Sequence, residues 1–400
     1  MVRMTALLGL LALVACVAGT QTDAQREALR QVAEANNAFS TDLYNVLRSE
    51  PGNLIVSPMS ASAALALVLQ GAGGRTAQQL QAALRLPADG DVIKDGFKEL
   101  FAGLESNNAT IVRIANKVYT KTGATIKAPF RSTAVDKFRA DAQELDFVND
   151  NEASRKTINR WVEHITDNKI RDLLAELDPS TLMVVVNAIY FKGSWEKPFA
   201  DGQTRNEPFH VSASSQVSVP MMHVTSHFRY ALLPELGARL LELPYQGRTM
   251  KMWVILPDEV DGLARVEAGL TSLNFSAVNR QMSSGEVIVS LPKFKIESTF
   301  QLHEKLPRLG VQDLFGPGAN LTGITDLSVS VSQVIQKAFV EVTEEGTVAA
   351  AATAVVAVVT SAVFDPRPPV IFKADHPFLF IITNVNDVML FVGRVQQPNV

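Results

Sequence analysis

MVVVNAIYFKGSW, residues 183–195, is the stretch that decides the fold class of this chain. Its first part, 183–190, is apolar at consecutive positions, with Asn187 as the single polar residue. A strand with one face in water alternates apolar and polar residues, whereas a strand covered on both faces does not. The stretch therefore predicts a central β-strand that is buried from two sides.

The segments around this strand predict an α+β protein. Helical patterns come mostly before it, over 25–48, over 61–70 behind Ser57 or Ser60 as a cap, in a shorter run capped by Thr76, and over 151–167. Strand patterns come mostly after it, at 250–256, 287–291, 378–382 and 389–392. This order is typical of helices packed on large antiparallel or mixed sheets.

The composition narrows the class of protein. The chain has 400 residues, of which 47% are hydrophobic and 20% charged, enough apolar material for one large core or two ordinary ones. Disorder is excluded for most of the chain, because low hydrophobicity and high net charge are both missing. The formal net charge is -4 and no long basic run occurs, so we expect no nucleic-acid partner.

Residues 1–19 are typical of a secretory signal peptide. Arg3 supplies a positive start, and 7–17 is an apolar stretch of about eleven residues, too short to span a bilayer. Small residues at Ala18 and Gly19 suit cleavage there, and the single cysteine, Cys16, would leave with the signal. The alternative is a bacterial lipoprotein box ending at Cys16. We expect a secreted, extracellular protein with one mature domain, residues 20–400, and no membrane span.

Three Asn-x-Ser/Thr triplets are candidate glycosylation sites, at Asn108, Asn274 and Asn320. Such triplets also arise by chance at about this density, so they support secretion only weakly.

The segment 347–364 contains no charged residue, although Glu344 and Glu345 precede it and Asp365 follows it. A transmembrane helix and a buried core helix are two interpretations of this segment. The third is a segment able to become a fully buried strand, because its small alanines would fit between existing strands and its valines favour extended structure. Prolines at 366, 368 and 369 would end that strand.

Several segments resemble the serpin family, in the family's order and from about residue 25 to the end. They are 53–60 with 71–76, 187–195, 220–223, 256–258, 291–294, 339–347 (FVEVTEEGT), 372–380 (FKADHPFLF) and 391–395. The resemblance is to secreted, inhibitory members of insect or arthropod type.

This resemblance implies a metastable fold with about nine helices, a five-stranded central sheet A, smaller sheets B and C, and an exposed reactive-centre loop at about 344–369. A protease that cleaves the loop forms an acyl-enzyme. The cut loop then inserts into the central sheet and distorts the protease before the ester hydrolyses. The implied function is irreversible inhibition of a serine protease by a monomer that is not itself an enzyme.

The resemblance also assigns roles to single residues. The hinge that must insert comprises Glu344, Gly346, Thr347, Ala349, Ala350, Ala351 and Ala352. Glu344 and Lys293 resemble an ion pair at the top of the central sheet, near Trp195. Ser57, Ser60 and Asn187 resemble a polar cluster beneath the sheet. Gln336 stands where the family usually has histidine; it can hydrogen-bond Asn187 or Ser57 but cannot titrate, so we expect little pH sensitivity there.

The family's spacing places the scissile bond at Thr360–Ser361, with Val359 as the nearest alternative. Such small or β-branched residues suit the shallow primary pocket of elastase-like proteases. Phe364, which would suit a chymotrypsin-like enzyme, and Arg367, which precedes a proline, follow in that order. A cysteine protease is a further possible target, and a non-inhibitory serpin that acts as a carrier or chaperone is the alternative function.

The sequence lacks the residue motifs of the common classes of hydrolase. The sequence has no Gly-x-Ser-x-Gly elbow, no His-Glu-x-x-His and no cysteine after residue 16. His223 and His227 lie in a strand or loop pattern, so we interpret them as surface histidines rather than metal ligands, and we expect neither a metal nor a cofactor. Heparin is not expected to bind the 94–117 region, because Lys94, Lys98, Arg113 and Lys117 are scattered among acidic residues.

Overall fold

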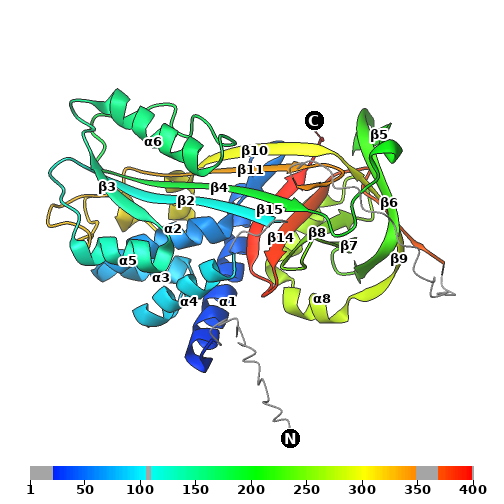
Figure 1. Ribbon diagram of the computed structural model, residues 1–400, viewed down its shortest axis with the longest axis horizontal. Helices are drawn as coiled ribbons and strands as arrows, with labels where there is room; N and C mark the ends of the chain where they lie inside the picture. The colour runs from blue at the N-terminus through cyan, green and yellow to red at the C-terminus, as the bar shows by residue number, and fades with distance from the viewer. Residues whose placement is uncertain (1–20, 105–109, 348–367, 399–400) are drawn as a thin grey trace, which may run out of the picture.

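The computed structural model describes residues 21–104, 110–347 and 368–398, and within them the chain forms helices packed on two β-sheets (Figure 1). The described α-helices are α1 (Asp23–Leu47), α2 (Pro58–Gly71), α3 (Gly74–Ala83), α4 (Gly90–Ala102), α5 (Ala128–Phe138), α6 (Asn151–Ile165), α7 (Leu263–Gly269), α8 (Phe275–Gln281) and α9 (Leu302–Lys305). Short 3-10 segments are η1 (Asp201–Gln203), η2 (Leu270–Ser272), η3 (Leu306–Leu309) and η4 (Asp313–Phe315).

The central sheet has the strand order β10-β11-β12-β4-β2-β3. Its strands are β10 (Phe294–Gln301), β11 (Gln333–Val342), β12 (Gly346–Thr347), β4 (Met183–Ser194), β2 (Thr110–Lys121) and β3 (Asp141–Leu145). β4 runs parallel to β11 and antiparallel to β2. The sheet therefore contains the five expected strands and a sixth, the two-residue β12, which lies between β11 and β4 at one end.

The second sheet has the order β1-β15-β14-β8-β7-β6-β9-β13, and β5 also pairs with β6. Its strands are β1 (Leu54–Val56), β5 (Arg205–Ser212), β6 (Ser215–Leu233), β7 (Ala238–Pro244), β8 (Met250–Pro257), β9 (Ser283–Pro292), β13 (Val370–Lys373), β14 (Phe378–Asn384) and β15 (Met389–Val395). The expected separate sheets B and C are joined, because β6 is long enough to pair with β5 at its start, β9 along its middle and β7 at its end.

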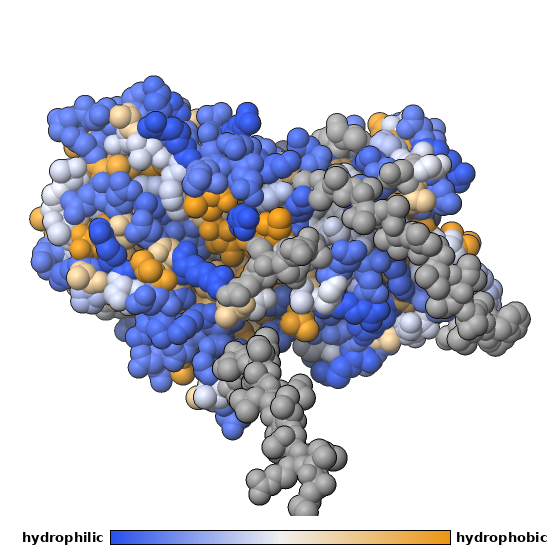
Figure 2. All heavy atoms as spheres, in the orientation of Figure 1, coloured by the Kyte–Doolittle hydropathy of each residue, from blue (hydrophilic) through white to orange (hydrophobic). Residues whose placement is uncertain are grey.

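The prediction that 183–190 is a strand buried on both faces is confirmed. Val185, Ile189 and Phe191 of β4 belong to the main hydrophobic cluster, which also contains much of α2. Val184 and Val186 point the other way, into a smaller cluster with Ile158 of α6 and its neighbours. Figure 1 shows the same arrangement, with α6 above the central sheet and α2 below it. Figure 2 shows a largely hydrophilic face, with apolar residues gathered near its middle.

The helix ends follow local capping chemistry. Thr22 and Gln25 form a reciprocal capping box at the start of α1, and Ser57 caps α2 by accepting a hydrogen bond from the Ser60 amide. The prediction that Thr76 caps the third helix is wrong. Gly73 occupies that position, and the buried Thr76 hydroxyl accepts a hydrogen bond from the Asn320 amide instead.

Among the helices of the described residues, none combines the length and the apolar character needed to cross a bilayer.

Candidate functional site

The hinge segment enters the central sheet as β12. Thr347 lies opposite Val342 of β11 on one side and Gly193 of β4 on the other, so the two-residue strand is paired on both edges. Gly346 has φ 155°, and a Cβ added there would come within 2.0 Å of the Gly193 carbonyl oxygen. Only glycine fits this approach, because any side chain would have to push β4 away. The glycine of the expected hinge is therefore required by the packing of the described structure.

Thr347 anchors β12 in the interior. Its side chain is fully buried, and its hydroxyl lies 2.7 Å from the Tyr245 hydroxyl. The Tyr245 ring stacks on Trp195 at a centroid distance of 4.5 Å. Burial raises the pKa of Tyr245 far above its usual value. The side chain of Thr347 thus lies in a neutral, closely packed site that has no room for a charge.

The turn between β11 and β12 is held by Glu344. Its carboxylate forms an ion pair with Lys293 at 2.8 Å and accepts a hydrogen bond from the Thr204 hydroxyl at 2.7 Å. Partial burial acts to raise the pKa of Glu344, but the hydrogen bonds from Lys293 and Thr204 outweigh it, so the pKa lies below its usual value. The expected Lys293–Glu344 pair is therefore present, with the carboxylate in its charged form.

Trp195 binds the same turn through its backbone and its ring. Its amide donates to the Glu345 carbonyl at 2.9 Å, and its indole N–H donates to the Thr343 carbonyl at 3.0 Å. The amide of Phe199 donates to the Glu344 carbonyl at 3.0 Å. The segment 195–199 thus holds the turn before β12 in place through these hydrogen bonds.

A cluster of buried polar side chains lies further along the central sheet, away from the hinge. Asn116, Asn187 and Gln336 occupy one register row across β2, β4 and β11, and each side chain is at most 2% exposed. The Gln336 amide donates to the Asn187 side-chain oxygen at 2.5 Å. The Asn187 amide donates to the Asn116 oxygen at 2.5 Å and to the Ser60 hydroxyl. These contacts make a row of amides that spans three strands.

Gln336 and Ser57 connect this row to α2 and to the second sheet. Gln336 donates to the Ser57 carbonyl at 2.8 Å and accepts from the Ser57 amide at 3.0 Å. The Ser57 hydroxyl donates to the Leu390 carbonyl of β15 at 2.6 Å. Gln336 therefore reaches both of the partners that the sequence allowed, Asn187 and Ser57, and it brings no titratable group into the cluster.

Sequence reasoning missed Asn116. The residue lies within β2 between apolar and charged neighbours, so it reads as a water-facing position of an ordinary strand. The signal that could have identified it is its pairing opposite Asn187, which only the strand register reveals. Its side-chain nitrogen is buried without a hydrogen-bond partner in the described residues. The amide row is thus incompletely satisfied on the β2 side.

The interpretation of His223 as a surface histidine is wrong. Its side chain is only 17% exposed, its Nδ1 lies 3.1 Å from the Ser290 hydroxyl, and its Nε2 lies 3.1 Å from Glu207. It therefore joins side chains of β5, β6 and β9. His227 is exposed, as expected. In the part of the chain that the structure describes, no group of three or more possible metal ligands occurs.

The remaining predicted positions divide between described and undescribed residues. Asn274 is exposed and caps α8 by accepting from the Ala277 amide at 2.9 Å. Asn320 is half-buried, and its side-chain oxygen accepts from the Thr322 hydroxyl at 2.9 Å. The positions outside the described residues are Cys16, Asn108, Ala349, Ala350, Ala351, Ala352, Val359, Thr360, Ser361, Phe364 and Arg367.

Comparison with known proteins gives one family. Residues 34–398 match the model of the family described as serpin (serine protease inhibitor). The leukocyte elastase inhibitor of Sus scrofa is 39% identical, over 92% of this chain and all of that protein. A serpin-like protein of Thermococcus kodakarensis is 36% identical, over 92% of this chain and 86% of its own length.

Solved structures agree in fold. The crystal structure of Serpin48, described as a highly specific serpin in the insect Tenebrio molitor, has a TM-score of 0.84 at 35% identity, covering 92% of this chain and 98% of its own. The similar proteins thus include one from a mammal, one from an insect and one from an archaeon, and they do not single out an arthropod type.

Proposed function

The chain belongs to the serpin family, and we propose that it is an irreversible, suicide-substrate inhibitor of a serine protease. The observation that carries the proposal is β12, since the hinge already lies between β11 and β4, where the cut loop would have to enter. The inhibitor supplies no catalytic group. Its contribution is the energy released when new strand pairing and burial replace an exposed loop.

The pairing register supports insertion of the whole segment. If the strand continued from Thr347 in the register of β12, Thr353 would come opposite both Asn187 and Gln336. Residues 349 and 351 would face the same side as Thr347, and both are alanines that fit a closely packed interior. The inserted strand would separate Gln336 from Asn187 and could offer the Thr353 hydroxyl to both amides.

The target we propose is an elastase-like or chymotrypsin-like serine protease. The family's spacing and the small Thr360 support the elastase-like choice, as does the similarity to an inhibitor named for leukocyte elastase. Phe364 supports a chymotrypsin-like enzyme as the second choice. Inhibition of a cysteine protease stays an alternative outcome of the same experiment.

We further propose that the protein is secreted after loss of residues 1–19 and acts as a monomer outside the cell. The charge and apolar pattern of 3–19 supports secretion. Asn274 is the described glycosylation candidate with the more open surroundings, because it is exposed while Asn320 packs against Gly73.

The test is to incubate the mature protein with elastase, chymotrypsin, trypsin, subtilisin and a papain-like enzyme. We expect a complex with elastase or chymotrypsin that survives denaturing electrophoresis, and a released C-terminal peptide that begins at Ser361. Cleavage without any stable complex would contradict the proposal.

Heat stability separates the inhibitor from a carrier or chaperone of the same fold. A loop that inserts adds a full strand to the central sheet, so the cleaved protein should melt well above the intact one. Equal melting temperatures would favour the non-inhibitory alternative.

A further inference from the structure

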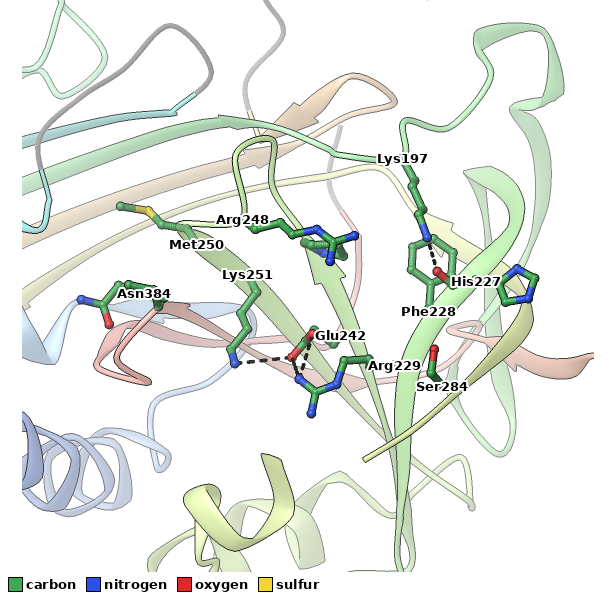
Figure 3. Close-up of a pocket in the computed structure, with 12 residues that line it drawn as sticks. Lys197, His227, Phe228, Arg229, Glu242, Arg248, Met250, Lys251, Ser284 and Asn384 are labelled. Carbon is green, nitrogen blue, oxygen red and sulfur yellow. Dashed lines mark hydrogen bonds and ion pairs between the residues drawn. The ribbon is translucent and has the colours of Figure 1, made fainter. Parts of the chain in front are cut away.

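A cavity of about 410 Å³ opens beside the second sheet (Figure 3). Through Lys197 it borders the segment 195–199, but the side chains that bind Glu344 and Thr347, those of Lys293, Thr204 and Tyr245, do not line it. This volume lies within the range of small-molecule sites, about 300–1,000 Å³. Four cationic side chains line it, from the segment after β4, from β6, from the β7–β8 turn and from β8: Lys197, Arg229, Arg248 and Lys251. The single carboxylate in the lining is Glu242.

Three of the four cations are already neutralised by carboxylates. Arg229 lies 3.1 Å from Glu242, and Arg248 lies 2.6 Å from Glu196. Lys251 lies 3.4 Å from Glu242 and 2.7 Å from Asp387. Figure 3 shows Glu242 held between Arg229 and Lys251. The acidic residues around the cavity are thus engaged, and they leave one positive charge in excess.

That charge belongs to Lys197. Its ammonium group donates to the backbone carbonyl of His227 and lies 5.1 Å from the centre of the Phe228 ring. Among the described residues, no carboxylate lies within 4 Å of it. A carbonyl dipole and a ring face stabilise a cation without neutralising it.

Burial makes this arrangement costly for the charged form. Lys197 is half-buried, and this burial lowers the pKa of its ammonium group despite the attraction of Glu196 nearby. A bound anion would offset this cost, because an opposite charge at contact favours the ammonium form.

The other walls of the cavity are apolar. Phe228, Pro244 and Met250 line it, and Val385, which is 65% exposed, lies at its rim. A simple inorganic ion would leave these surfaces in water, whereas an apolar body would cover them. We propose that this cavity binds a small amphiphilic anion, whose acidic head pairs with Lys197 and whose apolar body lies against Phe228 and Met250.

A matched pair of fluorescent probes tests the proposal. The first is 8-anilinonaphthalene-1-sulfonate, and the second is N-phenyl-1-naphthylamine, which has the same rings without the sulfonate. We expect saturable binding of the sulfonate at about one site per folded chain, and binding of the neutral probe at least about tenfold weaker. Equal affinity for the two probes, or no saturable binding of the sulfonate, would overturn the proposal.

The variant Lys197→Met keeps the length of the side chain and removes its charge. It should weaken binding of the sulfonate about tenfold and leave the neutral probe unchanged. Lys156→Met, at an exposed lysine of α6, is the matched control and should change neither affinity. Lys197→Arg, which keeps the charge, should bind the sulfonate within about threefold of the original protein and guards against a folding defect in the methionine variant. Unchanged sulfonate binding by a folded Lys197→Met variant would show that Lys197 does not hold the ligand.

Discussion

The contact between β4 and β11 is built in two different ways along its length. At the hinge end the strands are kept apart by β12, and the turn above it is tied by the ion pair of Lys293 and Glu344, whose side chains are 27% and 11% exposed. Further along, β4 and β11 pair directly from Val184 to Tyr190, and the row of buried amides crosses them.

If the cut loop inserts as we propose, this difference indicates where resistance to insertion lies. The Lys293 side chain is 27% exposed, so water can replace part of the hydrogen bonding of this ion pair, and separating it should cost less than separating fully buried amides. The fully buried amides have no such replacement, and parting Gln336 from Asn187 leaves both unsatisfied until a new partner arrives. We therefore expect the hinge end to open first and the amide row to control how far insertion proceeds.

The largest expected effect comes from closing the hinge end to insertion. Thr347→Arg would place a guanidinium group in the neutral site beside Tyr245, where the desolvation penalty is several kcal/mol. We expect the protease to cleave this variant as a substrate, with the yield of complex that survives denaturing electrophoresis falling at least about tenfold. Thr225→Arg, at an exposed position of β6, is the control and should form complex normally. A normal yield from Thr347→Arg would mean that the hinge does not need to enter at this point.

The next effect concerns the buried amides. Asn187→Ala removes the hydrogen bonds to Ser60, Asn116 and Gln336 and leaves their polar atoms buried. We expect the free energy of unfolding of the intact protein to fall by about 2–4 kcal/mol, measured by urea denaturation. Asn206→Ala, at an exposed position of β5, should change it by less than about 0.5 kcal/mol. An equally small change for Asn187→Ala would show that the row of buried amides does not stabilise the contact between β4 and β11.

The same two regions differ in how much the sequence could predict. The resemblance to serpins assigned the hinge, and the residue types there agree with that assignment locally, with a glycine where strands approach closely and small residues after it. Ser57 could be proposed as a cap for the same local reason. Asn116 was missed because its role depends on which strand lies beside β2. The pairing of two strands that are far apart in the sequence cannot be deduced from the residues of either strand alone.

The joining of the second sheet and the hydrogen bond of Thr76 were missed for a related physical reason. The residue pattern of β6 does not predict that this one strand joins the two sheets that were expected to be separate. Thr76 has the residue type of a cap, but its hydroxyl is taken by a segment far along the chain, at Asn320. Local propensity thus predicted elements well, and tertiary contacts decided their ends and partners.

A smaller effect would come from making the amide row titratable. Gln336→His places an imidazole group among buried amides, where burial favours the neutral form and lowers its pKa below the unfolded value of about 6.5. The unfolded chain then binds the extra proton at acidic pH, so stability falls as pH decreases. We expect a loss of about 1 kcal/mol at about pH 5.5 relative to neutral pH, beyond that of the original protein. If the free energies of unfolding of the two proteins changed in parallel with pH, the site would tolerate a charge.

The smallest effect is expected at the ion pair. Lys293→Met leaves Glu344 with the Thr204 hydroxyl as its hydrogen-bond partner, and it should reduce the free energy of unfolding by about 1 kcal/mol at neutral pH. Because the pair lowers the pKa of Glu344, its contribution is present above the unfolded carboxyl value of about 4.3 and is lost as pH falls through the lower folded value. The two proteins should therefore converge in stability in acid.

Lys127→Met is the matched control for this pair, because it breaks an ion pair with Asp326 whose carboxylate is 90% exposed. It should change stability by much less than about 1 kcal/mol at every pH. If Lys293→Met were as harmless as Lys127→Met and yet slowed complex formation, the ion pair would guide the hinge without stabilising the intact fold. A loss as large as that of Asn187→Ala would instead place the main resistance to insertion at the hinge end and reverse the order proposed here.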